Sequence, residues 1–153
     1  MKRSIKMVLA ASALVAFGAA EAQAQQAKPE EVLALRKGVY QVIRASFGPL
    51  AGFADGKVQL DAAKAQLLGT RLAAVAPMAA EVFPTDSDFV AGSKAKPEIW
   101  SKPADFKAKM DAFQTAAAKL ADAAKAGNLE AVKAAVPDVG KACKACHEDF
   151  REK

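Results

Sequence analysis

The sequence is most informative in the residue types that it almost lacks. Its 153 residues include one histidine, one tryptophan, one tyrosine and two cysteines. One histidine and two cysteines fall short of the four ligands of a structural zinc site and leave no material for a disulfide framework. No run of β-branched residues alternates with polar ones, so no strand is predicted.

Long hydrophobic runs and an excess of one charge are also missing. The main apolar run, residues 7–20, is shorter than the roughly 20 residues that a bilayer-spanning helix needs. The formal net charge is +5, and the lysines are interspersed with acidic residues rather than clustered. This pattern argues against a nucleic-acid-binding protein.

The N-terminus has the three parts of a secretory signal peptide. A basic stretch that contains Lys2, Arg3 and Lys6 precedes the apolar run, and two A-x-A cleavage patterns follow at residues 20–22 and 22–24. We predict a signal of residues 1–24 and a periplasmic location; an uncleaved membrane anchor is the alternative. Removal leaves residues 25–153 as one domain with 19 basic and 16 acidic residues, a net charge of +3.

A C-x-x-C-H motif, Cys143-Lys144-Ala145-Cys146-His147, lies close to the C-terminus. This is the attachment signature of a c-type haem, in which two thiols bind the macrocycle and the histidine ligates iron. On a helix the three side chains fall at i, i+3 and i+4, so they share one face. We therefore predict one covalent haem c with His147 as the metal ligand. A redox C-x-x-C would need a βαβ unit, and a disulfide at this spacing is strained on a helix.

Four stretches carry the 3.6-residue apolar periodicity of amphipathic helices. The first is predicted from Pro29, a favoured first-turn residue, to about Ala54. The second follows the N-cap candidate Asp61 and ends or kinks at Pro77. Their apolar stripes are Val32, Leu35, Val39, Val42, Ile43, Phe47 and Leu50, then Leu67, Leu68, Leu72 and Val75.

Residues 83–103 form the longest irregular stretch and separate the first two helices from two more. The third helix is predicted to begin near Pro103, and the fourth follows the N-cap candidate Asn128 with a kink at Pro137. Apolar positions of the fourth are spaced alternately by three and four, as in a bundle seam: Leu129, Val132, Val136, Val139, Cys143, Cys146 and Phe150. We predict an all-α antiparallel four-helix bundle with one long connection between helices two and three, and a haem facing its interior.

Taken together, these residues resemble the cytochrome c′ family of class II c-type cytochromes. The resemblance covers essentially the whole chain after the signal. It rests most on residues 27–31, Arg36-Lys37, Phe47-Gly48, residues 96–101 and residues 139–151. It implies an antiparallel four-helix bundle, usually a homodimer, whose high-spin iron is five-coordinate and binds nitric oxide and carbon monoxide. Nitric oxide handling and electron transfer to redox partner proteins are the implied roles.

The resemblance also assigns roles to single residues. Tyr40 matches the side chain that covers the vacant iron face, with Val39 or Ile43 as alternatives; a bundle-core aromatic is the simpler interpretation. Arg36 matches a haem-propionate-binding arginine, against a solvated surface arginine. Arg151 matches an arginine beside the proximal pocket, against a cation that complements a helix C-terminus. Lys37 is a weaker candidate for a haem-edge contact. Lys107, Lys109, Lys141 and Lys144 form either a positive rim for acidic redox partners or an ordinary solvated face.

The ligand inventory favours an iron without a second protein ligand. Low-spin class II relatives use a methionine from the first helix, but the methionines beyond the signal are Met78 and Met110. We therefore expect a gas-binding haem protein or, alternatively, a low-spin electron carrier. An enzyme such as a peroxidase would need a polar distal acid–base pair, for which no second histidine exists, so we expect no enzymatic activity.

Overall fold

The computed structural model describes residues 28–153, and the predicted signal of residues 1–24 lies outside them. Helices make up most of the described chain. Their bounds are α1 Pro29–Ala54, α2 Ala62–Val75, α3 Met78–Glu81, α4 Glu98–Ser101, α5 Pro103–Lys125 and α6 Leu129–Phe150. Within residues 28–153 the only β-type pairing outside the helices is an isolated antiparallel bridge between Ala95 and Arg151.

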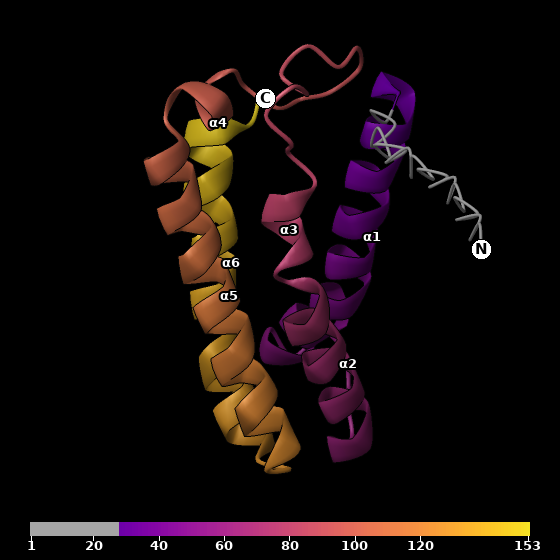
Figure 1. Cartoon of the computed structure of the whole chain (residues 1–153). Coiled ribbons are helices and arrows are strands. Elements are labelled where there is room, and N and C mark those ends of the chain that lie inside the picture. Colours follow the sequence, from indigo (N-terminus) through magenta and orange to yellow (C-terminus); the bar gives the residue numbers. More distant parts are fainter. Residues whose placement is uncertain (1–27) are drawn as a thin grey trace, which may run out of the picture.

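The four long helices form an antiparallel bundle, as the sequence predicts (Figure 1). Helix α5 packs against α6 and α2, and α1 packs against α2 and α6. The connections α1–α2 and α5–α6 lie at one end of the bundle. The long crossover from α2 to α5, with α3 and α4 in it, reaches the other end, where the C-terminus also lies.

The short connections end the helices as the sequence predicts. The Asp61 carboxylate accepts a hydrogen bond from the Lys64 amide at 2.7 Å, and the Asn128 side chain accepts one from the Ala131 amide at 2.9 Å. Both are N-caps that satisfy an unpaired first-turn donor. Gly127 adopts φ +69°, a conformation that glycine reaches without steric cost, and this lets α5 turn sharply into α6. Helix α6 runs on through Pro137 without a break.

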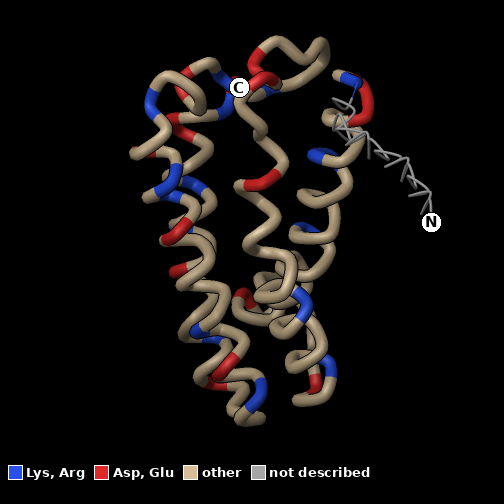
Figure 2. The backbone as a smooth tube through the Cα atoms, viewed as in Figure 1, with Lys and Arg blue, Asp and Glu red and all other residues tan. Residues whose placement is uncertain are grey.

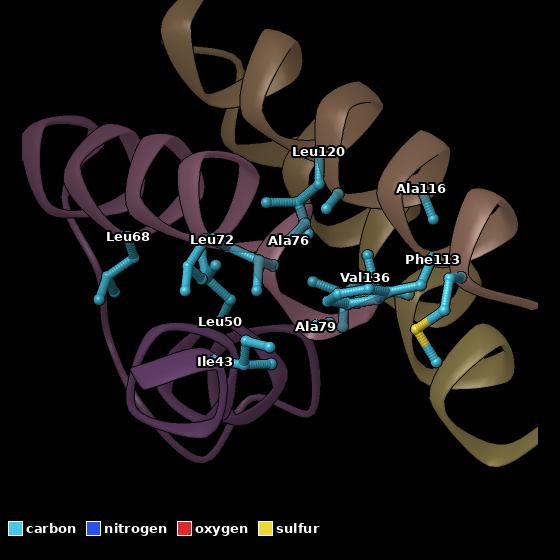
Figure 3. Packing of buried hydrophobic residues seen from close by; sticks show 14 of the residues in the cluster. Ile43, Leu50, Leu68, Leu72, Ala76, Ala79, Phe113, Ala116, Leu120 and Val136 are labelled. Carbon is cyan, nitrogen blue, oxygen red and sulfur yellow. The ribbon is translucent and has the colours of Figure 1, made fainter. Parts of the chain in front are cut away.

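The core is filled by the inward stripes of the four long helices. Leu50, Leu72 and Leu120 are fully buried, and Figure 3 shows them with Phe113 and Val136 between the helices. Alanines complete the contact where α5 approaches its neighbours, because their small side chains let the helix backbones come close. The fully buried set on α5 therefore includes Ala117, Ala121 and Ala124.

Three apolar residues that we predicted on inward stripes point outward instead. Leu35 is 56% exposed, Val42 is 42% exposed, and Leu67 on α2 is 48% exposed. Their neighbours Val39, Ile43 and Leu68 are buried, so the apolar arc of these helices is wider than the core that they contact. Leu35 and Val42 are seven residues apart on α1 and therefore lie on one outer face.

Across residues 28–153, none of the helices combines the length and the apolar character that crossing a bilayer requires.

Gly69 marks the closest approach of α2 to α5. A Cβ atom at this position would lie 3.1 Å from the Ala124 Cβ and 3.3 Å from the Ala121 Cα. We expect Gly69→Val to lower the free energy of unfolding by about 1–3 kcal/mol, because the added atoms force α2 and α5 apart. Ala74→Val on the exposed side of α2 is the matched control and should cost less than about 1 kcal/mol. Urea unfolding measures both; equal effects would contradict the tight helix crossing.

Candidate functional site

The last turns of α6 present the C-x-x-C-H residues on one side of the helix. Cys143 and Cys146 are free thiols, each half-buried against the core, and the more exposed His147 follows on the same side of the helix. The two cysteines are thus turned toward the bundle interior, as the seam pattern predicted. Two thiols one turn apart beside an imidazole are the donor set that a covalent haem c requires.

Burial controls the protonation of these groups. It raises the pKa of the Cys143 thiol, and it raises that of Cys146 to about 11, with the neighbouring Cys143 adding to the effect. Both thiols are therefore protonated at neutral pH. Partial desolvation, and then the positive charge of Arg151, lower the pKa of His147. Its imidazole is accordingly neutral at pH 7, the form that ligates metals.

Tyr40 brings α1 to the cysteines. Burial is the main reason why its pKa lies well above the usual range, and the proximity of Cys146 and Cys143 adds to it. The phenol donates a hydrogen bond to the Ala79 carbonyl at 3.1 Å, which fixes the ring between α1 and the start of the crossover. An edge-to-face contact with Phe83, 6.2 Å between ring centroids, holds its other side. Tyr40, Cys143 and Cys146 thus pack against the same hydrophobic core.

Arg36, one turn before Tyr40, is buried rather than solvated, with only 6% of its surface exposed. Its Nε donates to the Val82 carbonyl at 3.0 Å, Nη1 to Ser93 Oγ at 2.8 Å and Nη2 to Ser87 Oγ at 3.0 Å. The guanidinium also lies 4.3 Å from the centroid of the Phe83 ring. One side chain of α1 therefore holds three points of the crossover.

All three hydrogen-bond acceptors of Arg36 are neutral. A guanidinium has five N–H donors, so three bonds leave two donors. Desolvation by burial lowers the pKa of Arg36. The ordinary pKa of an arginine is so high that the guanidinium nevertheless stays charged. Buried charges are stable when an opposite charge or strong hydrogen bonds compensate them. This arrangement therefore has the capacity to accept an anion.

The other two predicted site residues lie at the margins. Lys37 is exposed on α1 beside a cavity of about 320 Å³, which Leu33 and Val90 also line. Arg151 is exposed at the end of α6, where its amide donates to the His147 carbonyl at 3.3 Å. Arg151 thus follows His147 closely, whereas nothing in the described contacts brings Lys37 to the cysteines.

The four lysines of the suggested positive rim are all neutralised by acidic neighbours. Figure 2 shows blue and red segments interspersed along α5 and α6 rather than a patch of one sign. The ion pairs are Lys107–Asp111 at 2.6 Å, Lys109–Asp149 at 3.0 Å, Lys141–Asp138 at 3.4 Å and Lys144–Glu148 at 3.6 Å. An ordinary solvated face is the interpretation that this pairing favours.

Sequence reasoning missed the crossover residues that surround Arg36. Ser87 and Ser93 lie in the irregular stretch, where no periodicity marks a buried position. Ser87 is nevertheless 3% exposed, and its hydroxyl also donates to the Pro84 carbonyl at 2.8 Å. The Trp100 indole donates to the same carbonyl at 2.8 Å. The density of proline, glycine and serine was the available signal, but it identifies turns rather than their partners.

We expect Arg36→Met to lower the free energy of unfolding by about 2 kcal/mol. The substitution keeps an unbranched side chain but removes three hydrogen bonds and leaves buried acceptors unpaired. Lys37→Met is the matched control on the adjacent exposed position and should stay within about 0.5 kcal/mol of the parent. Urea unfolding of the purified proteins measures both. Two equal effects would show that the Arg36 contacts contribute nothing to stability.

Comparisons with known proteins agree with this geometry. The family model described as Cytochrome C' matches residues 31–151. Cytochrome c' of Cereibacter sphaeroides is 40% identical over 152 residues, which cover 97% of this chain and 99% of the relative.

Two solved structures are also similar. The crystal structure of cytochrome c' from Rubrivivax gelatinosus has a TM-score of 0.79 and 36% identity, over 84% of this chain and all of that one. A nitric oxide complex of a cytochrome c prime variant from Alcaligenes xylosoxidans has a TM-score of 0.76 and 36% identity, over 84% and 99% of the two chains. The chain therefore belongs to the cytochrome c′ family, whose members carry one covalently attached c-type haem.

Proposed function

We propose that this protein is a periplasmic monohaem cytochrome whose iron is five-coordinate and high-spin. It binds small neutral diatomic molecules such as nitric oxide and carbon monoxide, transfers electrons, or does both. Cys143 and Cys146 would attach the haem, and His147 would ligate its iron. The haem would supply a redox-active iron that can bind a further small ligand. The chain holds it, orients it and excludes water.

The position of Tyr40 is the observation that carries this proposal. Its ring packs against the same hydrophobic core as the cysteines, and a hydrogen bond to Ala79 and an aromatic contact with Phe83 hold it there. A buried, protonated phenol fills space without offering a strong metal ligand. Tyr40 would therefore exclude water and anions from the second iron face, while a small neutral molecule displaces little.

The remaining candidates for a sixth ligand lie elsewhere. Met78 is exposed on α3, and Met110 is buried on α5 in the hydrophobic core. Neither belongs to α1, the helix that approaches the cysteines through Tyr40, and His147 is the sole histidine of the sequence. The same inventory offers no histidine for acid–base chemistry opposite His147, so we propose ligand binding rather than enzymatic turnover.

Arg36 is proposed to bind a haem propionate with its two remaining N–H donors. The neutral character of its three protein acceptors supports this role, because a carboxylate would compensate the buried positive charge. Lys37 and Arg151 are proposed as contacts at the haem edge and beside His147. Export through the signal of residues 1–24 supports the periplasmic location, since haem is attached to such motifs in the exported compartment.

Electronic and resonance Raman spectra test the coordination. After acid–acetone extraction the haem should stay with the protein, and near neutral pH the iron should be mainly high-spin. Tyr40→Ala should increase carbon monoxide affinity about tenfold. In the parent protein the incoming ligand must displace the Tyr40 ring, and making room in a packed interior costs about 1–3 kcal/mol, which the variant would not need to spend. Phe53→Ala, an aromatic near the end of α1 that lies beside Lys133 and far along α6 from the cysteines, is the control and should change this affinity little.

Three outcomes would contradict the proposal separately. Haem that extracts freely would exclude covalent attachment through both thiols. A low-spin wild-type spectrum would favour the electron-carrier alternative with a second iron ligand. Equal carbon monoxide affinities in Tyr40→Ala and Phe53→Ala would remove Tyr40 from the second iron face.

We also propose a homodimer through the outer face of α1. Leu35 and Val42 expose about half of their surfaces on this face, and exposed apolar patches of this kind indicate an interaction site. A two-fold contact between copies would bring the same residues together from both chains.

The double variant Leu35→Glu/Val42→Glu should be monomeric at concentrations where the parent is dimeric, because four carboxylates would then meet in one interface. Light scattering coupled to size exclusion measures the mass. Phe89→Glu is the control, since Phe89 is 87% exposed but lies on the crossover. A monomeric parent, or a double variant that stays dimeric, would contradict the α1 interface.

A further inference from the structure

The C-terminal turn of α6, which carries His147, is held by a segment of the crossover. We propose that residues 93–96, here named the strap, fix the orientation of His147, and that Lys96 is its main positioning residue. The inference rests on the proposed role of His147 as axial ligand. It concerns residues that touch neither the cysteines nor the imidazole, but the backbone on which the imidazole is mounted.

The evidence begins with the carbonyl groups at the end of α6. A helix leaves its last four carbonyls without partners inside the helix. Here the Glu148 and Asp149 carbonyls accept hydrogen bonds from Lys96 Nζ at 3.1 and 3.3 Å, and the Phe150 carbonyl accepts one from the Lys96 amide at 3.0 Å. The His147 carbonyl accepts from the Arg151 amide. Lys96 therefore satisfies three of the four groups, and its charge complements the negative end of the helix dipole.

A second set of contacts fixes the chain just beyond the helix. Ala95 pairs with Arg151 in the antiparallel bridge, and the Glu152 amide donates to the Lys94 carbonyl at 2.9 Å. Figure 1 shows the C-terminus beside the loop that leads into α4. Phe150, between these contacts and His147, is 4% exposed and packs edge-to-face on Phe106 at 5.4 Å. The turn is thus held from the strap side and from the core side.

The other end of the strap is attached to α1. Ser93 Oγ accepts hydrogen bonds from Arg36 Nη1 at 2.8 Å and from the Ala95 amide at 3.1 Å. The strap therefore connects the buried guanidinium on α1 with the C-terminal turn of α6. Its two ends are hydrogen-bonded to α1, which carries Tyr40, and to α6, which carries His147.

These contacts have a specific consequence for a metal ligand. Groups that hold a ligating histidine in place tune the strength and direction of its bond to the metal, although they do not touch the metal. Without the Lys96 Nζ contacts, the Glu148 and Asp149 carbonyls lose these partners, and the last turn of α6 frays more readily. The imidazole would then sample a wider range of orientations, and the iron–histidine bond would weaken.

Lys96→Met tests this in the haem-loaded, full-length protein. Methionine keeps an unbranched apolar side chain but removes the Nζ donor and its charge, while the backbone contacts remain. Lys94→Met is the matched control on the same strap. Lys94 Nζ donates at 3.1 Å only to the carbonyl of Lys153, the last residue, and so lies outside the turn of His147.

Two measurements separate positioning from simple stabilisation. Hydrogen exchange should speed up about tenfold at the Arg151 amide of Lys96→Met, a factor that corresponds to about 1.4 kcal/mol. The iron–histidine stretching band in the resonance Raman spectrum of the ferrous protein should move to lower frequency and broaden. Lys94→Met should leave both measurements near the parent values. Ser93→Ala releases the strap from Arg36 and should move the band in the same direction. It serves as a second test should Lys96→Met fold poorly.

The outcomes distinguish this inference from the proposed function. Covalent haem with an unchanged stretching band in Lys96→Met and Ser93→Ala would overturn the positioning role and leave the proposed function intact. Faster exchange without a band shift would make Lys96 a purely structural cap and would also overturn it. A parent protein without an iron–histidine band would overturn the proposed five-coordinate ligation by His147, and the positioning role with it.

Discussion

Burial of one guanidinium between α1 and the crossover is the constraint on which the rest of the site depends. Arg36 is largely shielded from water, so its N–H groups must find acceptors inside the fold. Val82, Ser87 and Ser93 supply them, and these bonds hold an otherwise irregular segment against α1. The crossover is therefore not a flexible linker between two helical hairpins. It is an ordered segment that forms a wall of the site.

This wall explains how a simple bundle can carry a demanding prosthetic group. The apolar stripes of four helices would by themselves pack against one another along their whole length and leave no room for a ligand, as they do around Leu50, Leu72 and Leu120. Beside the crossover, aromatic rings and a charged side chain take over from aliphatic ones. Phe83 meets both Tyr40 and Phe106 edge to face, and the Arg36 guanidinium lies over its ring.

The sequence predicted what local chemistry determines, and it did not predict what distant chemistry determines. Asp61 and Asn128 act on backbone groups three residues away, so their capping roles could be read directly and are confirmed. The seam of α6 could be read for the same reason. The prediction that Leu35 faces the core was wrong, because periodicity gives the width of the apolar arc of a helix but not the part of that arc that the core covers. The partners of Arg36 and the contacts of Lys96 lie far along the chain from these residues, and no pattern within a helix encodes them.

Those long separations also say something about the order in which the molecule assembles. The hydrogen bonds of Arg36 join residues 46 to 57 positions apart, and those of Lys96 Nζ join residues 52 and 53 positions apart. Helices α5 and α6, by contrast, are joined by residues 126–128 and can pair as a local hairpin. Closing long loops costs more chain entropy than closing short ones, and contacts of this kind slow folding. The hairpin that carries the cysteines can therefore form early, whereas the enclosure around it waits for the first helix and the last residues to be in place together.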